Sequence, residues 1–297
     1  MLARMLRLTI AMQMVFGAAI GYWLSEEGSG LAPLVLQLAL CALAAPLLMN
    51  LLTVGYGFVR SRSGESTALW CKALIGECQA SVQFFLLRQP WAFDPPSLQQ
   101  ANSKPARIPV LLVHGFVCNH RVWDVMAPAL VRRGHTVLAL NLEPLFTSID
   151  DYAEQLEQAV QTLRQQTGQQ QIALIGHSMG GLVIRAWMRR YGSQLVARAI
   201  TLGTPHAGTQ LRSMVSTPNG LQMAWHSIWL KDLAASETDA IRHTLRLALS
   251  AQDNVVYPQR AQTLAGVTPK VFEGLGHVQL CKAPEVLHWV ASELALL

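Results

Sequence analysis

One serine, in the Gly-His-Ser-Met-Gly segment at residues 176–180, has the strongest chemical signature in this sequence. A short apolar run at 172–175 precedes the segment, and an amphipathic run at 182–188 follows it. This order predicts a strand, a sharp turn that holds the hydroxyl clear of the backbone, and a helix. Glycines let neighbouring backbones approach closely in such a turn, and a helix start supplies free N–H groups. Ser178 is therefore the predicted nucleophile.

A serine nucleophile needs a base, and His277 is the best placed of the histidines that follow it. Residues 271–277 predict a short strand that ends in a glycine-rich loop with the histidine at its tip. A loop histidine at a sheet edge can turn its imidazole toward a serine. Other histidines lie in helical-looking sequence, which indicates surface or core positions: His226, His243 and His288.

The acid that would orient this imidazole is predicted to be Asp253, in the loop that follows a strand at 245–249. Asp232 and Asp239 lie in a helical stretch rich in Ala and Glu, where solvated side chains are expected. Asp and His both favour loops, so each residue could simply form a turn. That reading is weakened because serine, acid and base follow strands in the order Ser, Asp, His.

Two backbone amides are candidates for an oxyanion hole. A buried-type strand at 108–113 runs into His114 and Gly115, so the N–H of Phe116 could face the serine. The N–H of Met179 is the second candidate, and losing one such donor typically costs about 3 kcal/mol of transition-state stabilisation. An ordinary turn is the alternative interpretation of the His-Gly pair. The substrate pocket is predicted to include Val117, His177, Met214, Trp225 and Trp229.

Together these motifs resemble those of the α/β-hydrolase family, and within it the bacterial lipases and esterases. The matching segments span roughly 108–297: 114–116, 176–182, 204–208, 253–256 and 276–277. The resemblance implies an α/β fold, a mostly parallel sheet flanked by helices, that acts through an acyl-enzyme without a cofactor or metal. The single apolar residue Phe116 looks like the lipase type of oxyanion loop.

The spacing of apolar runs supports such a sheet, because strands predicted at 136–140 and 196–202 alternate with a helix predicted at 149–166. The alternation breaks at 209–244, where Met and Trp are interleaved with polar residues. The family carries a cap insertion at this point, so a helical cap over Ser178 is expected. Plain helix packing against the sheet is the alternative.

Before residue 60 the sequence is dominated by two apolar runs, with 18 uncharged residues between Arg7 and Glu26 and 32 between Glu27 and Arg60. A spanning helix needs about 20 apolar residues. We therefore predict transmembrane helices at about 8–24 and 31–58, the second kinked at Pro46. Residues 1–60 would form a membrane anchor, 61–107 a connector and 108–297 the catalytic domain. A signal peptide or a buried soluble helix is the alternative for the first run.

Charges around these runs predict the orientation in a bacterial inner membrane. Arginines precede the first run, glutamates separate the two runs, and Arg60, Arg62 and Lys72 follow the second. The positive-inside rule then places both ends of the hairpin, and the catalytic domain, in the cytoplasm. If only one run spans the membrane, the domain is periplasmic instead.

Overall composition excludes several other classes of protein. The net charge of +5 suits an anionic lipid surface, and no arginine-rich run or nucleic-acid motif occurs. The five cysteines form no C-x-x-C pair, so structural zinc is not expected. Cys118 and Cys281 could form a disulfide, but packing as small hydrophobic side chains is the preferred interpretation. The sequence does not indicate an oligomeric state.

A membrane-anchored serine carboxylic-ester hydrolase acting on lipid or other apolar acyl esters is the predicted function. An acyltransferase would use the same triad and differ only in its acceptor. A non-catalytic, membrane-tethered binding protein is the remaining alternative, although such proteins usually lose a triad member, and here all three residue types are present.

Overall fold

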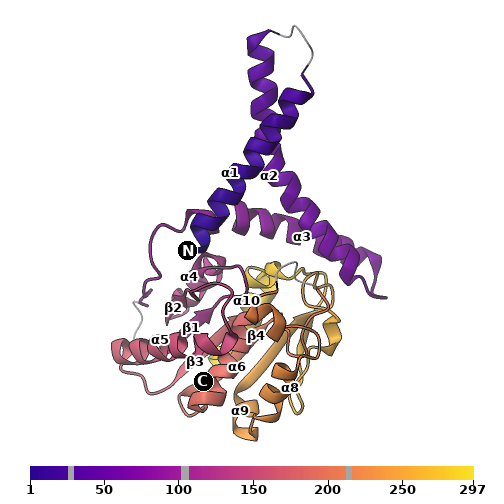
Figure 1. Ribbon diagram of the computed structural model, residues 1–297. Coiled ribbons are helices and arrows are strands. Elements are labelled where there is room, and N and C mark those ends of the chain that lie inside the picture. The colour runs from indigo at the N-terminus through magenta and orange to yellow at the C-terminus, as the bar shows by residue number, and fades with distance from the viewer. Residues whose placement is uncertain (26–29, 102–106, 212–215) are drawn as a thin grey trace.

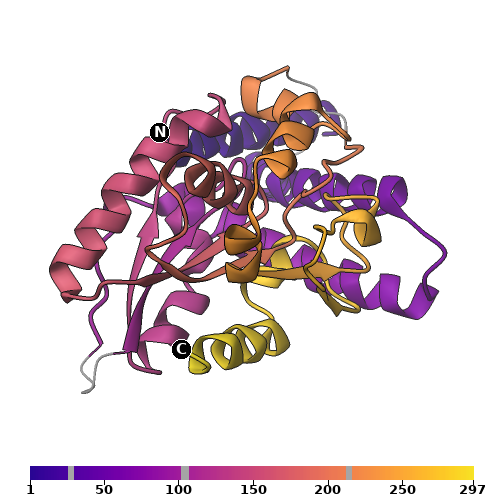
Figure 2. The ribbon, with the colours of Figure 1, turned by 90° about the horizontal axis from the view of Figure 1, so that it is seen from below.

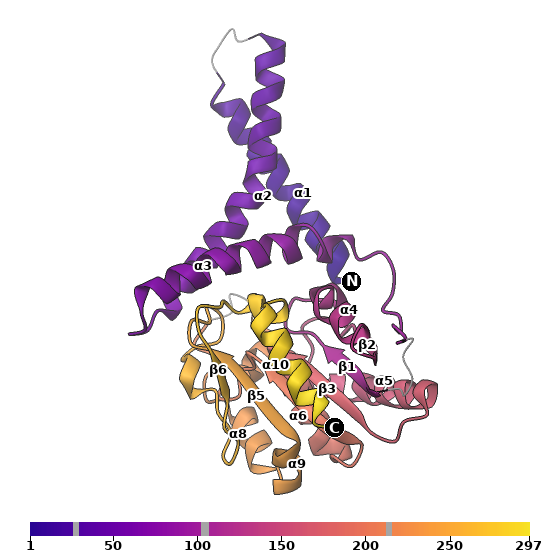
Figure 3. The same ribbon diagram turned by 180° about the vertical axis from the view of Figure 1, so that it is seen from behind.

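The computed structural model describes residues 1–25, 30–101, 107–211 and 216–297. A two-helix hairpin, α1 (Leu2–Trp23) and α2 (Leu31–Ser61), projects from a rounded α/β body (Figure 1). A third helix, α3 (Thr67–Ser81), lies across the base of the hairpin, between it and the body (Figure 3).

Within the described residues, six strands form one sheet in the order β2-β1-β3-β4-β5-β6, and every neighbouring pair is parallel. The predicted parallel sheet is confirmed. Strand β3 is buried along its whole length, which explains why it reads as a continuous apolar run. The strands are β1 (Arg107–Val113), β2 (His135–Leu140), β3 (Ile172–His177), β4 (Val196–Leu202), β5 (Leu245–Ser250) and β6 (Lys270–Phe272).

Helices cover both faces of the sheet (Figure 2). Strand β1 shows the division: Leu111 packs with α5 and α6, whereas Leu112 packs with α4 and α10 on the other face. The predicted helix at 149–166 is confirmed, and it ends at Gly168, whose φ of 68° is the left-handed conformation that glycine favours at a helix end. The flanking helices are α4 (Met126–Val131), α5 (Tyr152–Thr167), α6 (Met179–Tyr191) and α10 (Pro284–Ala295).

Between β4 and β5 the described chain forms three short helices, α7 (Pro218–Gln222), α8 (Ile228–Ala235) and α9 (Asp239–Thr244). Their apolar side chains join the same core cluster as α5 and α6. A buried ion pair fixes them further, because Arg185 Nε of α6 lies 2.5 Å from Glu237 Oε1. Single turns of 3-10 or π-helix occur at Val82–Leu86, Gln89–Trp91, His120–Trp123, Ile149–Asp151, Gln259–Ala261 and Val278–Cys281.

Both hairpin helices are long and apolar enough to cross a membrane, by length and composition. They are longer than predicted, and α2 continues through Pro46. They pack closely at Gly17, where an added Cβ would lie 2.3 Å from the Cys41 carbonyl oxygen; small residues at helix crossings are typical of membrane helix pairs. Elsewhere their large side chains are exposed, including Leu8, Met12, Val15, Phe16, Leu36, Leu40, Leu43 and Leu48.

The last turns of α2 pack directly on the α/β body. An added Cβ at Gly57 would lie 2.7 Å from the Asn254 carbonyl oxygen. The side chain of Gln259 donates to the Ser61 carbonyl at 2.9 Å and to the Asp253 carbonyl at 2.8 Å. The second hairpin helix is therefore joined to the loop that follows β5.

This close approach predicts different effects for two glycines of the same helix. Gly57→Ala should lower the free energy of unfolding by about 1–3 kcal/mol, the usual cost of overpacking, since backbone lies in the way. Gly55→Ala meets nothing within 4 Å and should raise it by up to about 1 kcal/mol through helix propensity. Thermal unfolding in detergent micelles measures both, and equal shifts of the same sign would contradict the packing.

Candidate active site

Ser178 occupies a strained turn between β3 and α6. Its backbone has φ 54° and ψ −126°, a conformation that non-glycine residues rarely adopt. Two glycines make this turn possible because they have no Cβ. An added Cβ at Gly180 would lie 2.1 Å from the Val113 carbonyl oxygen, and one at Gly176 would lie 2.5 Å from the Gly181 nitrogen. The Ser178 N–H donates to the Leu202 carbonyl at 2.8 Å. The glycines thus allow α6 to begin directly behind the serine, against the ends of the central strands.

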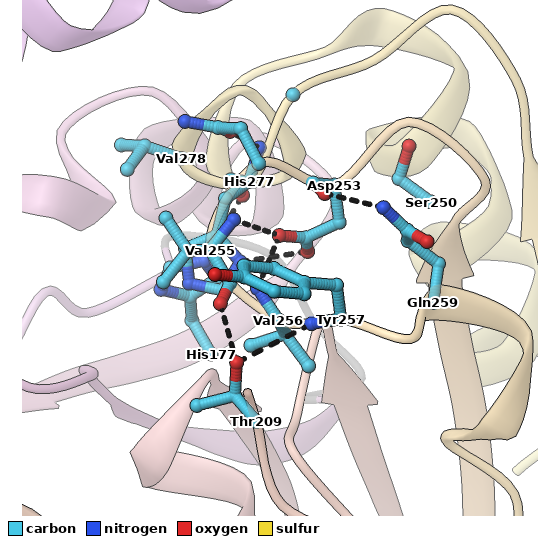
Figure 4. Close-up of polar contacts among 12 residues, drawn as sticks. His177, Thr209, Ser250, Asp253, Val255, Val256, Tyr257, Gln259, His277 and Val278 are labelled. Atoms are coloured by element: carbon cyan, nitrogen blue, oxygen red, sulfur yellow. Dashed lines mark hydrogen bonds and ion pairs between the residues drawn. The ribbon is translucent and has the colours of Figure 1, made fainter. Parts of the chain in front are cut away.

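His277 and Asp253 meet in the loops that follow β6 and β5, as Figure 4 shows. The Nδ1 of His277 lies 2.7 Å from the Oδ2 of the buried Asp253 carboxylate. The other carboxylate oxygen accepts the N–H groups of Val255 at 2.8 Å and Val256 at 2.7 Å. Because these bonds fix the carboxylate, it holds the imidazole with Nδ1 as donor and leaves Nε2 free to act as a base.

The charges around His277 favour its protonated form. Burial by itself lowers the pKa of this imidazole, but the Asp253 carboxylate beside it, with a smaller contribution from Glu77, raises the pKa above its ordinary value of 6.5. The carboxylate partner therefore outweighs the effect of desolvation on this imidazole.

A cavity of about 260 Å³ contains both Ser178 and His277. Most of its lining is apolar, and much of it comes from α2 and α3 rather than from the insertion after β4. The described residues that line it are Thr53, Val54, Tyr56, Gly57, Glu77, Ser81, Phe85, Phe116, Cys118, His177, Ser178, Leu211, Asn254, Val255, His277 and Val278.

The loop after β1 lies against the serine. An added Cβ at Gly115 would be 2.8 Å from the Cβ of Ser178, so only glycine permits this approach. Within the described ranges, neither the Phe116 N–H nor the Met179 N–H has an intramolecular acceptor. Both amides are therefore available to an oxyanion. Val117, the next residue, has φ 51°, which is strained for a β-branched side chain.

His114 fixes the shape of this loop. Its Nε2 accepts the Leu142 N–H at 3.0 Å, so its Nδ1 carries the proton and donates to the Gly115 carbonyl at 2.9 Å. Burial lowers its pKa to about 4, so the imidazole is neutral at physiological pH. The sequence indicates only a turn at this residue, whereas in the structure it braces the candidate oxyanion loop.

His177 braces the loop that carries His277. Its Nε2 donates to the His277 carbonyl oxygen at 3.1 Å, and the two imidazole rings lie 4.6 Å apart between centroids. Burial and the neighbouring imidazole of His277 lower the pKa of His177 well below its ordinary value. This residue lines the cavity as predicted for the pocket and also braces the loop of His277.

Glu77 of α3 is a site residue that the sequence analysis did not identify. Its carboxylate is buried and accepts the N–H groups of Val278 and Gln279, both at 2.9 Å, directly after His277. Burial is the main reason that its pKa is raised to about 7. An added Cβ at Gly276 would lie 2.5 Å from the Glu77 side chain. Nothing in a helical run at 67–81 indicates such a long-range contact.

Three of the predicted pocket residues do not line this cavity, and one falls outside the described residues. Val117 lines a much smaller pocket beside Phe116 and Leu142. Trp229 Nε1 donates to Asp150 at 2.7 Å beside α6, and Trp225 packs on His226. Both are held away from the serine because the insertion packs on α6. Met214 is not described. Leu211 is the described residue of the insertion that reaches the cavity.

All five cysteines are free thiols, and Cys118 and Cys281 are buried. The structure therefore agrees with the preferred interpretation of these two as small packing side chains. Burial raises the pKa of Cys118 to about 12, so it is inert as a nucleophile at neutral pH.

Comparison with known proteins supports this reading of the fold. Residues 108–228 match the model of the alpha/beta hydrolase fold family. A triacylglycerol lipase of Burkholderia plantarii is 33% identical over 177 residues, which is 55% of this chain and 47% of that protein. One from Pseudarthrobacter phenanthrenivorans is 35% identical over 129 residues, 39% of this chain and 40% of that protein. The chain spans less than half the length of these curated relatives.

Solved structures show the same fold. The mature lipase BlEst2 of Bacillus licheniformis superposes with a TM-score of 0.59 at 17% identity, covering 68% of this chain and 99% of that one. Lipase B of Aspergillus fumigatus gives 0.58 at 18% identity, covering 67% and 56%. The chain is an α/β-hydrolase-fold protein, and it is similar to lipases and esterases.

The environment of His277 predicts its titration. Its pKa should lie above 6.5, and Asp253→Asn should lower it because the neighbouring negative charge is lost while burial remains. Histidine NMR of protein in detergent micelles measures this, with His277→Gln identifying the resonance. The exposed Asp232→Asn is the control, and an unchanged pKa in Asp253→Asn would contradict the pairing.

Proposed function

We propose that this protein is a membrane-anchored serine carboxylic-ester hydrolase that acts on lipid or other apolar acyl esters. One observation carries the proposal: Ser178, on its strained turn, shares an apolar cavity with His277, whose Nδ1 is bonded to the Asp253 carboxylate at 2.7 Å. The similarity to lipases and esterases supports an ester as the substrate.

In the proposed reaction, Ser178 Oγ attacks the ester carbonyl carbon while His277 Nε2 takes the hydroxyl proton. The negative charge that develops on the carbonyl oxygen is stabilised by the N–H groups of Phe116 and Met179. The C–O bond of the ester then breaks, and His277 returns the proton to the departing alcohol. Water, activated by the same imidazole, hydrolyses the acyl-enzyme to release the acid and restore Ser178. Asp253 stabilises the charged imidazolium in both halves of the reaction.

The hairpin supports membrane anchoring. Burial within the protein does not explain its apolar character, since only 11% of the most apolar window of α1 and 6% of that of α2 is buried. Both ends of the hairpin lie beside the α/β body (Figure 1). Basic residues such as Arg4, Arg60 and Arg62 occur at these ends, which favours the cytoplasmic face of a bacterial inner membrane.

The length of α2 explains how an anchor could reach the active site. Its 31 residues give about 46 Å of helix, whereas a bilayer core is about 30 Å thick. The last turns therefore extend beyond the hydrocarbon, where Val54 and Gly57 line the cavity at Ser178. An enzyme built in this way would meet its substrates at the membrane surface.

Replacing the nucleophile tests the proposal directly. Ser178→Ala should lower kcat for p-nitrophenyl acyl esters by at least about a thousandfold, since a triad without its nucleophile retains only oxyanion and binding effects. Wild-type protein should react with a fluorophosphonate probe, and the variant should not. Ser292→Ala, on the exposed side of α10, is the matched control; unchanged turnover in Ser178→Ala would refute the assignment.

The pH profile should report the His277 base. Because the protonated imidazole cannot accept the serine proton, kcat/KM should fall as pH decreases through an apparent pKa above 6.5. Glu77→Gln should lower that pKa, since it removes a nearby negative charge, and should reduce kcat because one amide acceptor is lost. Glu273→Gln, at an exposed carboxylate, should change neither quantity. An apparent pKa that does not move in Glu77→Gln would rule out this coupling.

A further inference from the structure

A second cavity of about 260 Å³ lies between the two arms of the hairpin, next to the cavity at Ser178. Its lining comes from the first half of α1, the middle of α2, and the end of α3 with the turn that follows. None of the described lining residues is charged. They are Leu6, Thr9, Ile10, Gln13, Pro46, Met49, Asn50, Thr53, Ser81, Phe85 and Leu86.

The two cavities adjoin, because Thr53, Ser81 and Phe85 line both of them. The hydroxyls at this junction are already bonded within the protein. Thr53 Oγ1 donates to the Met49 carbonyl at 2.8 Å, and Ser81 Oγ accepts from Asn50 Nδ2 at 2.9 Å. The junction therefore offers an occupant the Thr53 methyl group and the Phe85 ring, a surface suited to hydrocarbon.

The length of the gap along α1 is smaller than the hydrocarbon of one leaflet. On α1 the lining runs from Leu6 to Gln13, about 10 Å of helix, within the roughly 15 Å half-thickness of a bilayer core. The arms pack closely farther along, at Gly17 and Cys41, and they diverge toward the α/β body (Figure 1). A gap between diverging spanning helices opens sideways to lipid.

We infer that this gap is an acyl-chain site, through which a bilayer glycerolipid enters between α1 and α2 and presents its ester to Ser178. The inference rests on the proposed function. An uncharged, mostly apolar lining fits a hydrocarbon chain and not a phosphate group. Each cavity alone is slightly below the 300–1,000 Å³ typical of ligand sites, and joined they fall within it. An extended chain is an occupant that can fill both.

Two tryptophan substitutions on the same helix separate this site from general effects on the anchor. Ile10→Trp places a large ring in the gap, whereas Leu8→Trp places it on the exposed face, where Leu8 is 56% exposed. With protein in vesicles, Ile10→Trp should lower kcat/KM for p-nitrophenyl palmitate by about tenfold or more, the scale of apolar pocket discrimination. Both variants should stay within about twofold of wild type for p-nitrophenyl butyrate, which is too short to need the gap.

An unchanged palmitate-to-butyrate ratio in Ile10→Trp would overturn the inference and leave the proposed function standing. Equal losses on both esters would also overturn it, because the gap would then not select for chain length. If instead Ser178→Ala still hydrolysed both esters, the proposed function would fail, and the acyl-chain site would then be tested by lipid binding alone.

A diazirine-bearing palmitate should label residues 6–13 in Ser178→Ala protein. This labelling should fall when Ile10→Trp is added and persist when Leu8→Trp is added. Labelling that is equal in both would contradict the site.

Discussion

The packing of α2 and α3 onto two loops of the sheet is the constraint on which the candidate site depends. Gly57 of α2 lies against Asn254, next to Asp253, and Glu77 of α3 accepts the two N–H groups that follow His277. An α/β sheet by itself brings strand ends together, but it does not fix the loops beyond them. Here helices from outside the α/β body close the site and form much of the cavity wall.

This arrangement also sets the electrostatics of the site. Burial by itself favours the neutral form of a histidine, as it does at His114, whose pKa is lowered to about 4. His277 behaves differently, because a carboxylate lies 2.7 Å from its Nδ1. The neutral His114 holds the candidate oxyanion loop, and the charge of Asp253 favours a protonated His277. Two histidines in one buried region thus have different roles because their hydrogen-bond partners differ.

Much of the α/β body could be predicted from the sequence. Strand β3 is predicted from its apolar run at 172–175, and the turn at Ser178 needs glycines whose spacing is visible in the chain. The loops that follow β5 and β6 also bring Asp253 and His277 together, since parallel strands end at one edge of the sheet. Their catalytic roles stay predictions.

What the sequence could not show are the contacts between distant segments. The sequence predicts that the insertion after β4 lies over the serine. In the structure the buried pair of Arg185 and Glu237 ties part of it to α6, and its Leu211 lines the cavity. Much of the described lining comes from α2 and α3, which the sequence assigns to the membrane anchor and the connector. Periodicity identifies an apolar face but does not say whether lipid, substrate or protein covers it.

The proposed roles of Ser178, the two amides and the gap are tested together by one experimental structure. It is that of the protein after reaction with a long-chain alkyl p-nitrophenyl phosphonate, a stable mimic of the tetrahedral intermediate. We expect a covalent bond from Ser178 Oγ to phosphorus and a phosphoryl oxygen about 2.7–3.1 Å from the Phe116 and Met179 nitrogens. The alkyl chain should pass Phe85 into the gap between α1 and α2. Attachment to another residue, or an oxygen directed away from both amides, would contradict it.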